Sequence, residues 1–154
     1  MDNTIIGLAR HVMLVLGKGH REHVYGKALE VGLNKAGIRY RSEICCPILF
    51  MGEIIGHGRA DFIVEDIVIE IKANKTPPAE ASDQLAKYLK SLNHVEKKNY
   101  RGLILNFNQS SGKVEVYYQG VPVVVSRFWQ GKQKAAAQPP STRSSDSRVH
   151  IYRP

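Results

Sequence analysis

The sequence is poor in cysteine and has no long apolar run. Its only two cysteines, Cys45 and Cys46, are adjacent, so we expect neither a disulfide framework nor a structural zinc site, and a reducing compartment, cytoplasm or nucleus, fits best. The longest apolar stretch near the N-terminus, residues 5–16, is interrupted by Arg10 and His11 and is too short to cross a bilayer. Nothing after it resembles a signal-peptidase site. We therefore expect an intracellular protein that is neither secreted nor inserted in a membrane.

The positive charge is not evenly spread along the 154 residues. The formal net charge is +8, and residues 131–154 contribute +4 of it, with five Lys or Arg against Asp146. That segment has almost no large apolar residues, so it cannot bury enough surface to offset its ordering entropy. We predict one domain over residues 1–130 and a disordered basic tail over residues 131–154. A basic surface favours a polyanion such as nucleic acid, but it also fits many other soluble proteins.

Apolar periodicity and turn residues predict an α/β domain with the element order α-α-β-β-β-β-α-β-β. Helices are expected over residues 4–16, 20–36 and 79–92. Strands are expected over residues 40–50, 53–56, 59–65, 67–73, 101–107 and 113–119. Residues 67–107 are long enough for a strand–helix–strand crossover, which would make two strands parallel and the sheet mixed.

The hairpin of residues 59–73 holds the most informative charges. A turn at Glu65-Asp66 would place Asp61 opposite Glu70. Because side chains alternate between the faces of a strand, one face is uniformly apolar and must lie against the core. It consists of Phe62, Val64, Ile67, Ile69 and Ile71. The other face consists of Asp61, Ile63, Val68, Glu70 and Lys72.

Two directly opposed carboxylates need a cation, because like charges on paired strand positions destabilise a sheet. Lys72 lies diagonally close enough to supply part of that compensation. A hard divalent ion would supply more, and oxygen ligands favour Mg²⁺ or Mn²⁺ over zinc. The alternative is a solvated face on which Lys72 forms a surface ion pair with Asp61 or Glu70.

Several further polar residues are candidates for the same site. Glu22 leads the apolar stripe of the second helix, so it points toward the sheet, or else it only complements the helix dipole. Gln84 and Tyr88 lie one turn apart among core-facing leucines of the third helix, and could instead be polar residues at the edge of the core. His57, Arg59 and Lys75 flank the hairpin and could contact phosphates, or could be ordinary surface charges.

Together these residues resemble a known family. The segment from Gly19 to Tyr25, Gly-His-Arg-Glu-His-Val-Tyr, resembles the signature of the GxxExxY proteins, which are placed in the PD-(D/E)XK nuclease superfamily. The resemblance continues in order and covers roughly residues 5–120. It includes residues 59–64 (Arg-Ala-Asp-Phe-Ile-Val), 68–73 (Val-Ile-Glu-Ile-Lys-Ala), Gln84 with Tyr88 and Leu89, and 102–107 (Gly-Leu-Ile-Leu-Asn-Phe).

The resemblance implies a restriction-endonuclease-like core, a central mixed sheet flanked by helices, with a metal at the hairpin. Asp61 and Glu70 would be direct ligands, with the Ile71 carbonyl as a third and Glu22 joining through water. Lys72 would position the attacking water or stabilise the phosphate in the transition state. Gln84 and Tyr88 would orient Lys72 or the scissile phosphate at the rim.

The function expected from these residues is Mg²⁺- or Mn²⁺-dependent hydrolysis of phosphodiester bonds, in DNA rather than RNA. The first alternative is a non-catalytic nucleic-acid-binding module. The second is an assembly protein that uses the hairpin and the tail for protein contacts. Opposed carboxylates favour the enzyme, because they would repel the phosphates that a binding module must hold. A domain of this size is also compatible with a homodimer or larger assembly that spans a duplex.

Overall fold

A computed structural model describes residues 1–76 and 79–118 together with the backbone of residues 121–123. The tail predicted over residues 131–154 lies outside the described residues. None of the helices within the described ranges is long and apolar enough to cross a bilayer.

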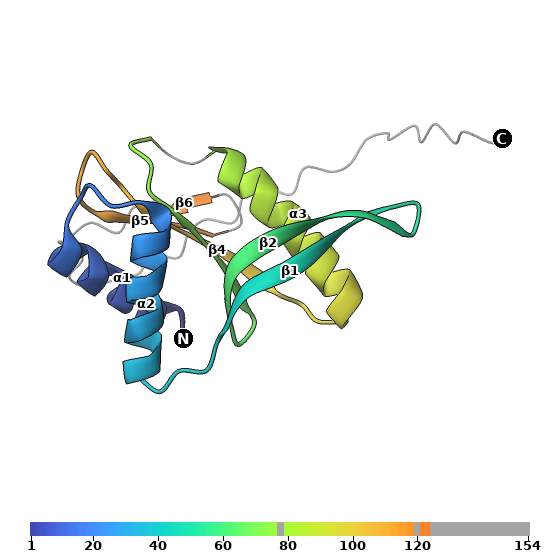
Figure 1. The fold of residues 1–154 in the computed structure, drawn as a ribbon, viewed down its shortest axis with the longest axis horizontal. Helices are drawn as coiled ribbons and strands as arrows, with labels where there is room; N and C mark the ends of the chain where they lie inside the picture. The colour runs from blue at the N-terminus through green and yellow to red at the C-terminus, as the bar shows by residue number, and fades with distance from the viewer. Residues whose placement is uncertain (77–78, 119–120, 124–154) are drawn as a thin grey trace, which may run out of the picture.

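Three helices and six strands make up this part of the chain (Figure 1). The helices are α1 (Asp2–Leu16), α2 (Glu22–Lys35) and α3 (Ala79–Glu96). The strands are β1 (Arg41–Phe50), β2 (Glu53–Val64), β3 (Ile67–Lys72), β4 (Arg101–Phe107), β5 (Val114–Tyr118) and β6 (Val121–Val123). All six strands form one sheet in sequence order, β1-β2-β3-β4-β5-β6.

The sheet is mixed, as predicted. β3 and β4 are parallel and are joined through α3, whereas the other neighbours are antiparallel. The hairpin register is also confirmed, because Phe62 pairs with Ile69 and Val64 with Ile67 around the turn at Glu65. This register sends alternate residues of β3 to opposite faces of the sheet.

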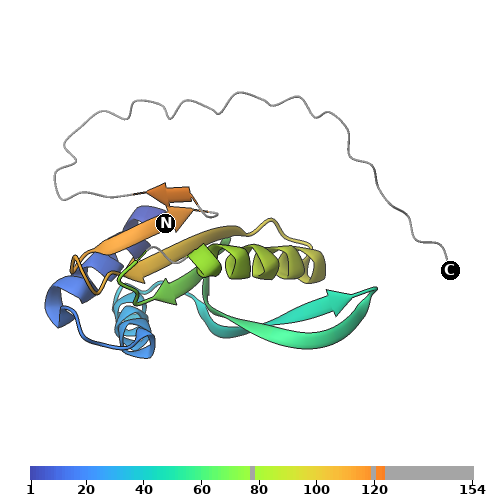
Figure 2. The ribbon, with the colours of Figure 1, turned by 90° about the horizontal axis from the view of Figure 1, so that it is seen from above.

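Each face of the sheet packs against helices, which gives three layers (Figure 2). On one face, α1 and α2 cover the predicted apolar set, with Phe62, Ile69 and Ile71 among its buried members. On the other face, Ile63 and Val68 pack under α3 against Leu85 and Leu92. Glu70 and Lys72 therefore share their face of β3 with a second core, which sequence patterning had not indicated.

The predicted strand boundaries need two corrections. The segments 53–56 and 59–65 are one continuous strand, so three strands rather than four precede α3. Gly56 and Gly58 do not break β2, because both stay paired with β1, to Ile48 and Cys46. The short final strand β6 was not predicted and pairs with β5.

Glycine is required at position 58 by packing against α3. A Cβ atom at Gly58 would collide with the ring of Tyr88. Position 58, which lies between the predicted strands 53–56 and 59–65, therefore marks a close approach of helix and strand.

Candidate active site

Asp61 lies where the strand ladder is interrupted on both sides of β2. Toward β3, pairing ends at Phe62, and toward β1 the regular pairs Ser42–Phe62 and Ile44–Ala60 flank an unpaired Glu43. Glu43 has a φ of +53°, a backbone conformation that L-residues rarely adopt. The opening lets the Asp61 carboxylate reach across to β3, where Oδ2 accepts a hydrogen bond of 2.7 Å from the Ile71 amide.

Glu70 and Lys72 form a largely buried ion pair on the α3 side of β3. The Lys72 ammonium donates to Glu70 Oε1 at 2.7 Å, and the Glu70 side chain is only 4% exposed. Glu70 Oε2 is buried without a hydrogen-bond partner among the described residues. Burying a carboxylate oxygen without a partner costs folding free energy, so a bound cation or a proton at Oε2 would stabilise the folded protein.

Electrostatics at these carboxylates disfavour their ionised forms. Burial raises the pKa of Glu70 to about 7, with the negative charge of Asp61 as the second cause and the Lys72 ammonium opposing both. Burial also raises the pKa of Asp61, against the hydrogen bond from Ile71. The pKa of Lys72 is raised as well: burial acts to lower it, but the hydrogen bond and charge of Glu70 outweigh that effect. Lys72 therefore stays charged, whereas Glu70 is poised to take up a proton or a metal ion.

A cavity of about 640 Å³ opens beside Asp61, between the start of α2 and the strands. Asp61, Ile71 and Glu22 all line it, so the structure brings Glu22 to the same side as Asp61. Glu22 is exposed rather than buried, and its charge contributes to raising the pKa values of Asp61 and Glu70. Glu22 thus lies at the rim of the cavity with its carboxylate in solvent, so the prediction that it points toward the sheet rather than the solvent is not confirmed, and its place in the first turn of α2 also fits the alternative of a helix-dipole partner.

The loop before α2 fixes where Glu22 sits. Gly17 and Gly19 have positive φ values, and the Tyr25 hydroxyl donates to the Gly17 carbonyl at 2.8 Å. The Gly19 amide donates to Gln109 Oε1 at 2.7 Å, which ties this loop to the turn after β4. Two distant segments thus hold the first turn of α2 over the cavity.

The other sequence candidates are only partly brought together. Gln84 donates to the Tyr88 hydroxyl at 2.5 Å, but within the described residues neither side chain hydrogen-bonds to Asp61, Glu70 or Lys72. Of the three candidate phosphate contacts, Arg59 lines the cavity. His57 and Lys75 are exposed and do not line it.

A family model described as the PD-(D/E)XK nuclease superfamily matches residues 1–118, which is most of the chain. The chain belongs to the PD-(D/E)XK nuclease superfamily. The restriction-endonuclease-like core predicted from the sequence is thereby confirmed. No curated protein and no solved structure matches the chain. The narrower resemblance to the GxxExxY proteins stays a prediction.

PD-(D/E)XK nucleases typically use divalent metals, and the residues present here fit such an ion. Glu70 Oε2 is an orphaned buried acceptor, and both Asp61 and Glu70 have raised pKa values that a cation would lower. Among the described residues no three His, Cys, Asp or Glu side chains are grouped closely enough to hold a metal. Two carboxylates suit Mg²⁺, which keeps several waters and takes one or two protein carboxylates.

Two groups of residues near the candidate site of this PD-(D/E)XK domain were not singled out by sequence analysis. The first is Arg21, at the N-cap of α2, with His23 and Lys27 within α2, and all three line the cavity. Arg21 and His23 flank Glu22 in the segment quoted for the family resemblance, which was the available signal. A second group is the buried Asn106, which pairs with Lys72 in the parallel ladder and donates to Glu115 at 2.8 Å.

The Asn106 network holds the chain directly after Lys72. Asn106 Oδ1 accepts from the Asn74 amide at 2.9 Å, while Glu115 also accepts from Asn108 and Tyr117. No sequence spacing joins these residues, because β3 and β4 become neighbours only through the α3 crossover.

Proposed function

We propose that this domain hydrolyses phosphodiester bonds in nucleic acid with Mg²⁺ or Mn²⁺, and that DNA is its substrate. The observation that supports this most directly is the cluster of Asp61, Glu70 and Lys72, in which Glu70 is buried and its Oε2 has no hydrogen-bond partner among the described residues. A purely structural ion pair would not need a second, part-buried carboxylate whose charge opposes the first.

Each side chain has a distinct role in this proposal. Asp61 and Glu70 hold the ion, and the Ile71 carbonyl is a third candidate ligand. The metal, when bound, supplies an activated water and neutralises charge on the phosphate. Lys72 keeps its proton and holds the attacking water or the developing charge on the phosphate. Glu22 acts from the rim of the cavity through water, and Arg21 and Arg59 neutralise flanking phosphates.

Cleavage by matched aspartate variants tests the proposal. Single-stranded DNA, duplex DNA and RNA are incubated with the wild type, Asp61→Asn and Asp66→Asn, with Mg²⁺ and with chelator. Asp66 belongs to the same hairpin but is exposed and paired with Arg101. We expect metal-dependent cleavage of DNA by the wild type and Asp66→Asn, and none by Asp61→Asn. Equal activity in all three proteins, or activity with chelator, would contradict the proposed site.

A non-catalytic binding module predicts a different outcome of the same experiment. Its DNA affinity would rise when Asp61 loses its charge, and no product would form with any metal. The clustering of the Asp61 and Glu70 carboxylates argues against that alternative, since they repel phosphate.

A further inference from the structure

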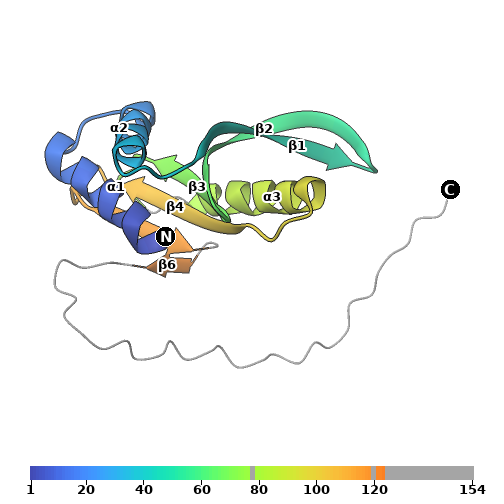
Figure 3. The same cartoon turned by 90° about the horizontal axis from the view of Figure 1, so that it is seen from below.

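The hairpin of β1 and β2 ends in an arm tip, residues 48–55, that exposes large apolar side chains. The hairpin runs out past α3, and its turn lies away from the other described elements (Figures 1 and 3). The exposed side chains are Ile48, Leu49, Phe50, Met51, Ile54 and Ile55, with exposed fractions from 38% to 88%. Apolar residues gathered in this way on a soluble surface mark an interaction site.

Apolar side chains lie on both faces of the arm tip. Leu49 pairs with Ile54 across the strands, while Ile48 precedes Leu49 and so points to the opposite face. Ile55 is the extra residue of a β-bulge beside this pair, since Ile48 pairs with Gly56. Neither face of the tip is therefore a polar, solvent-adapted face.

The turn itself carries an apolar residue against local preference. Met51 and Gly52 both have positive φ values, +49° and +85°, as in a tight two-residue hairpin turn. Such turns favour Asn, Asp or Gly at the position of Met51. Met51 is nevertheless 88% exposed, so neither folding nor burial within the described domain accounts for it.

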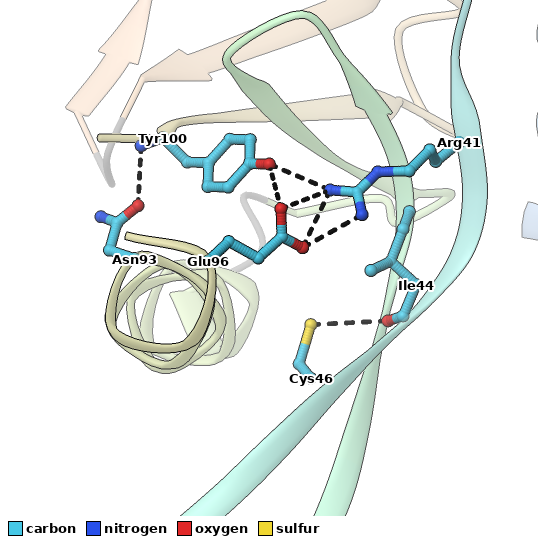
Figure 4. Close-up of polar contacts among 6 residues, drawn as sticks. All are labelled: Arg41, Ile44, Cys46, Asn93, Glu96 and Tyr100. Atoms are coloured by element: carbon cyan, nitrogen blue, oxygen red, sulfur yellow. Dashed lines mark hydrogen bonds and ion pairs between the residues drawn. The ribbon is translucent and has the colours of Figure 1, made fainter. Parts of the chain in front are cut away.

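The root of the arm is fixed to α3, in contrast to its tip (Figure 4). The Arg41 guanidinium donates to both carboxylate oxygens of Glu96 and to the Tyr100 hydroxyl. Nearer the tip, the Ser91 hydroxyl donates to the Pro47 carbonyl, and Cys46 is buried under α3. The tip is thus held out in a defined direction before any partner binds, which lowers the ordering cost of binding.

Charge argues against nucleic acid as the partner of the arm tip. From residue 42 to residue 58 the chain has no Lys or Arg, although it has 22 in total. Glu53 at the turn would repel phosphates or an anionic lipid surface. An apolar patch whose only charged residue is Glu53 is instead self-complementary over its apolar part, as an interface between two identical copies must be.

The exposed area is also of the right size for such an interface. The six exposed fractions amount to roughly 650 Å² when a large side chain is taken as about 180 Å². This total covers both faces and the turn of the tip, and it compares with about 300–600 Å² for the largest single patch on most monomers. It approaches the roughly 800 Å² that each partner contributes to a standard protein interface.

We propose that the arm tip of residues 48–55 is a homodimerisation surface, which packs against the same tip of a second copy of this chain. The dimer does not depend on the proposed cleavage reaction, because the tip contains none of the candidate active-site residues.

Sedimentation velocity of the full chain and of Met51→Lys tests the dimer. The substitution lies at an exposed turn, so it leaves the fold intact, but it places two like charges in a two-fold apolar contact. We expect a dimeric wild type and a dissociation constant raised about 100-fold or more in Met51→Lys. Leu14→Lys on the exposed side of α1 is the matched control and stays dimeric.

Two further measurements separate the alternatives. Met51→Cys in a Cys45→Ser background should crosslink between two copies with a short bis-maleimide. DNA affinity should be unchanged or slightly higher in Met51→Lys; a loss of DNA affinity without a change in association state would assign the tip to nucleic acid and overturn the proposal. A wild type that is monomeric at every concentration would overturn it as well.

Discussion

Replacing Glu70 by glutamine removes the ionisable group whose pKa burial raises to about 7. In the unfolded chain the ordinary value of 4.5 applies. Between these two pH values the folded protein keeps a proton that the unfolded chain releases. The protonated Glu70 therefore stabilises the folded state relative to the unfolded chain. This contribution to the free energy of unfolding is fully present below about pH 4.5 and is lost as the pH rises through about 7.

The size of this effect follows from the difference between the two pKa values. At about 1.4 kcal/mol per pH unit, ionised Glu70 costs the metal-free folded state about 3 kcal/mol. Glu70 is almost fully buried, so solvent screening does not reduce this figure substantially. Glutamine has the same shape and no charge, so Glu70→Gln should lack this part of the pH dependence.

Urea unfolding in chelator, from pH 5 to pH 8, measures the effect directly. The unfolding free energy of the wild type minus that of Glu70→Gln should fall by about 2.5 kcal/mol over this range, which samples most of the full difference. Added Mg²⁺ should restore the wild type at pH 8 by mass action and leave the variant unchanged. Glu65→Gln, at the exposed turn of the same hairpin, should follow the wild type. Parallel profiles for the wild type and Glu70→Gln would refute a buried carboxylate poised for a cation.

Three other changes test separate parts of the structure. Lys72→Ala should lose about 10²–10³ in cleavage rate and lower the metal-free melting temperature, because Glu70 loses its partner. The exposed Lys35→Ala, in the last turn of α2, is the control, and an unimpaired cleavage rate in Lys72→Ala would remove Lys72 from the reaction. Gly58→Ala should lower the free energy of unfolding by about 1–3 kcal/mol, because the added Cβ collides with the Tyr88 ring. The control is Gly7→Ala in α1, where a Cβ meets nothing within 4 Å, and it should raise the free energy of unfolding by about 0.5–1 kcal/mol. Equal urea midpoints for the two variants would disprove the close approach. Asn106→Ala should lower the free energy of unfolding by about 1–3 kcal/mol, because the Asn74 amide and Glu115 each lose a hydrogen-bond partner. An unchanged free energy in urea unfolding would show that the network does not stabilise the fold.

The hairpin could be predicted because its information is local. The turn at Glu65 fixes the register of β2 with β3, and strand alternation then assigns Phe62 and Ile69 to one face and Glu70 to the other. Helix periodicity likewise predicted the buried stripe of Tyr25, Leu29 and Leu33 in α2, although Glu22 at its start is exposed.

The features of the fold and site that could not be predicted depend on contacts between segments far apart in the sequence. The reach of Asp61 to the Ile71 amide depends on the unpaired Glu43, which no periodicity predicts. Asn106 meets Lys72 only because the α3 crossover makes β3 and β4 parallel. Likewise, β2 was predicted as two separate strands because the sequence does not show that Tyr88 of α3 packs against Gly58 between them.

The continuity of β2 constrains how this chain can vary in length. One strand carries the Met51–Gly52 turn at one end and Asp61 near the other. Residues can be added in pairs on the two strands near the turn, and the arm would lengthen without disturbing Asp61. A single residue inserted between Gly58 and Asp61 would change which way the Asp61 side chain points, so that its carboxylate would no longer reach the Ile71 amide. The length of the arm can therefore vary, whereas the direction in which each β2 side chain near Asp61 points is fixed.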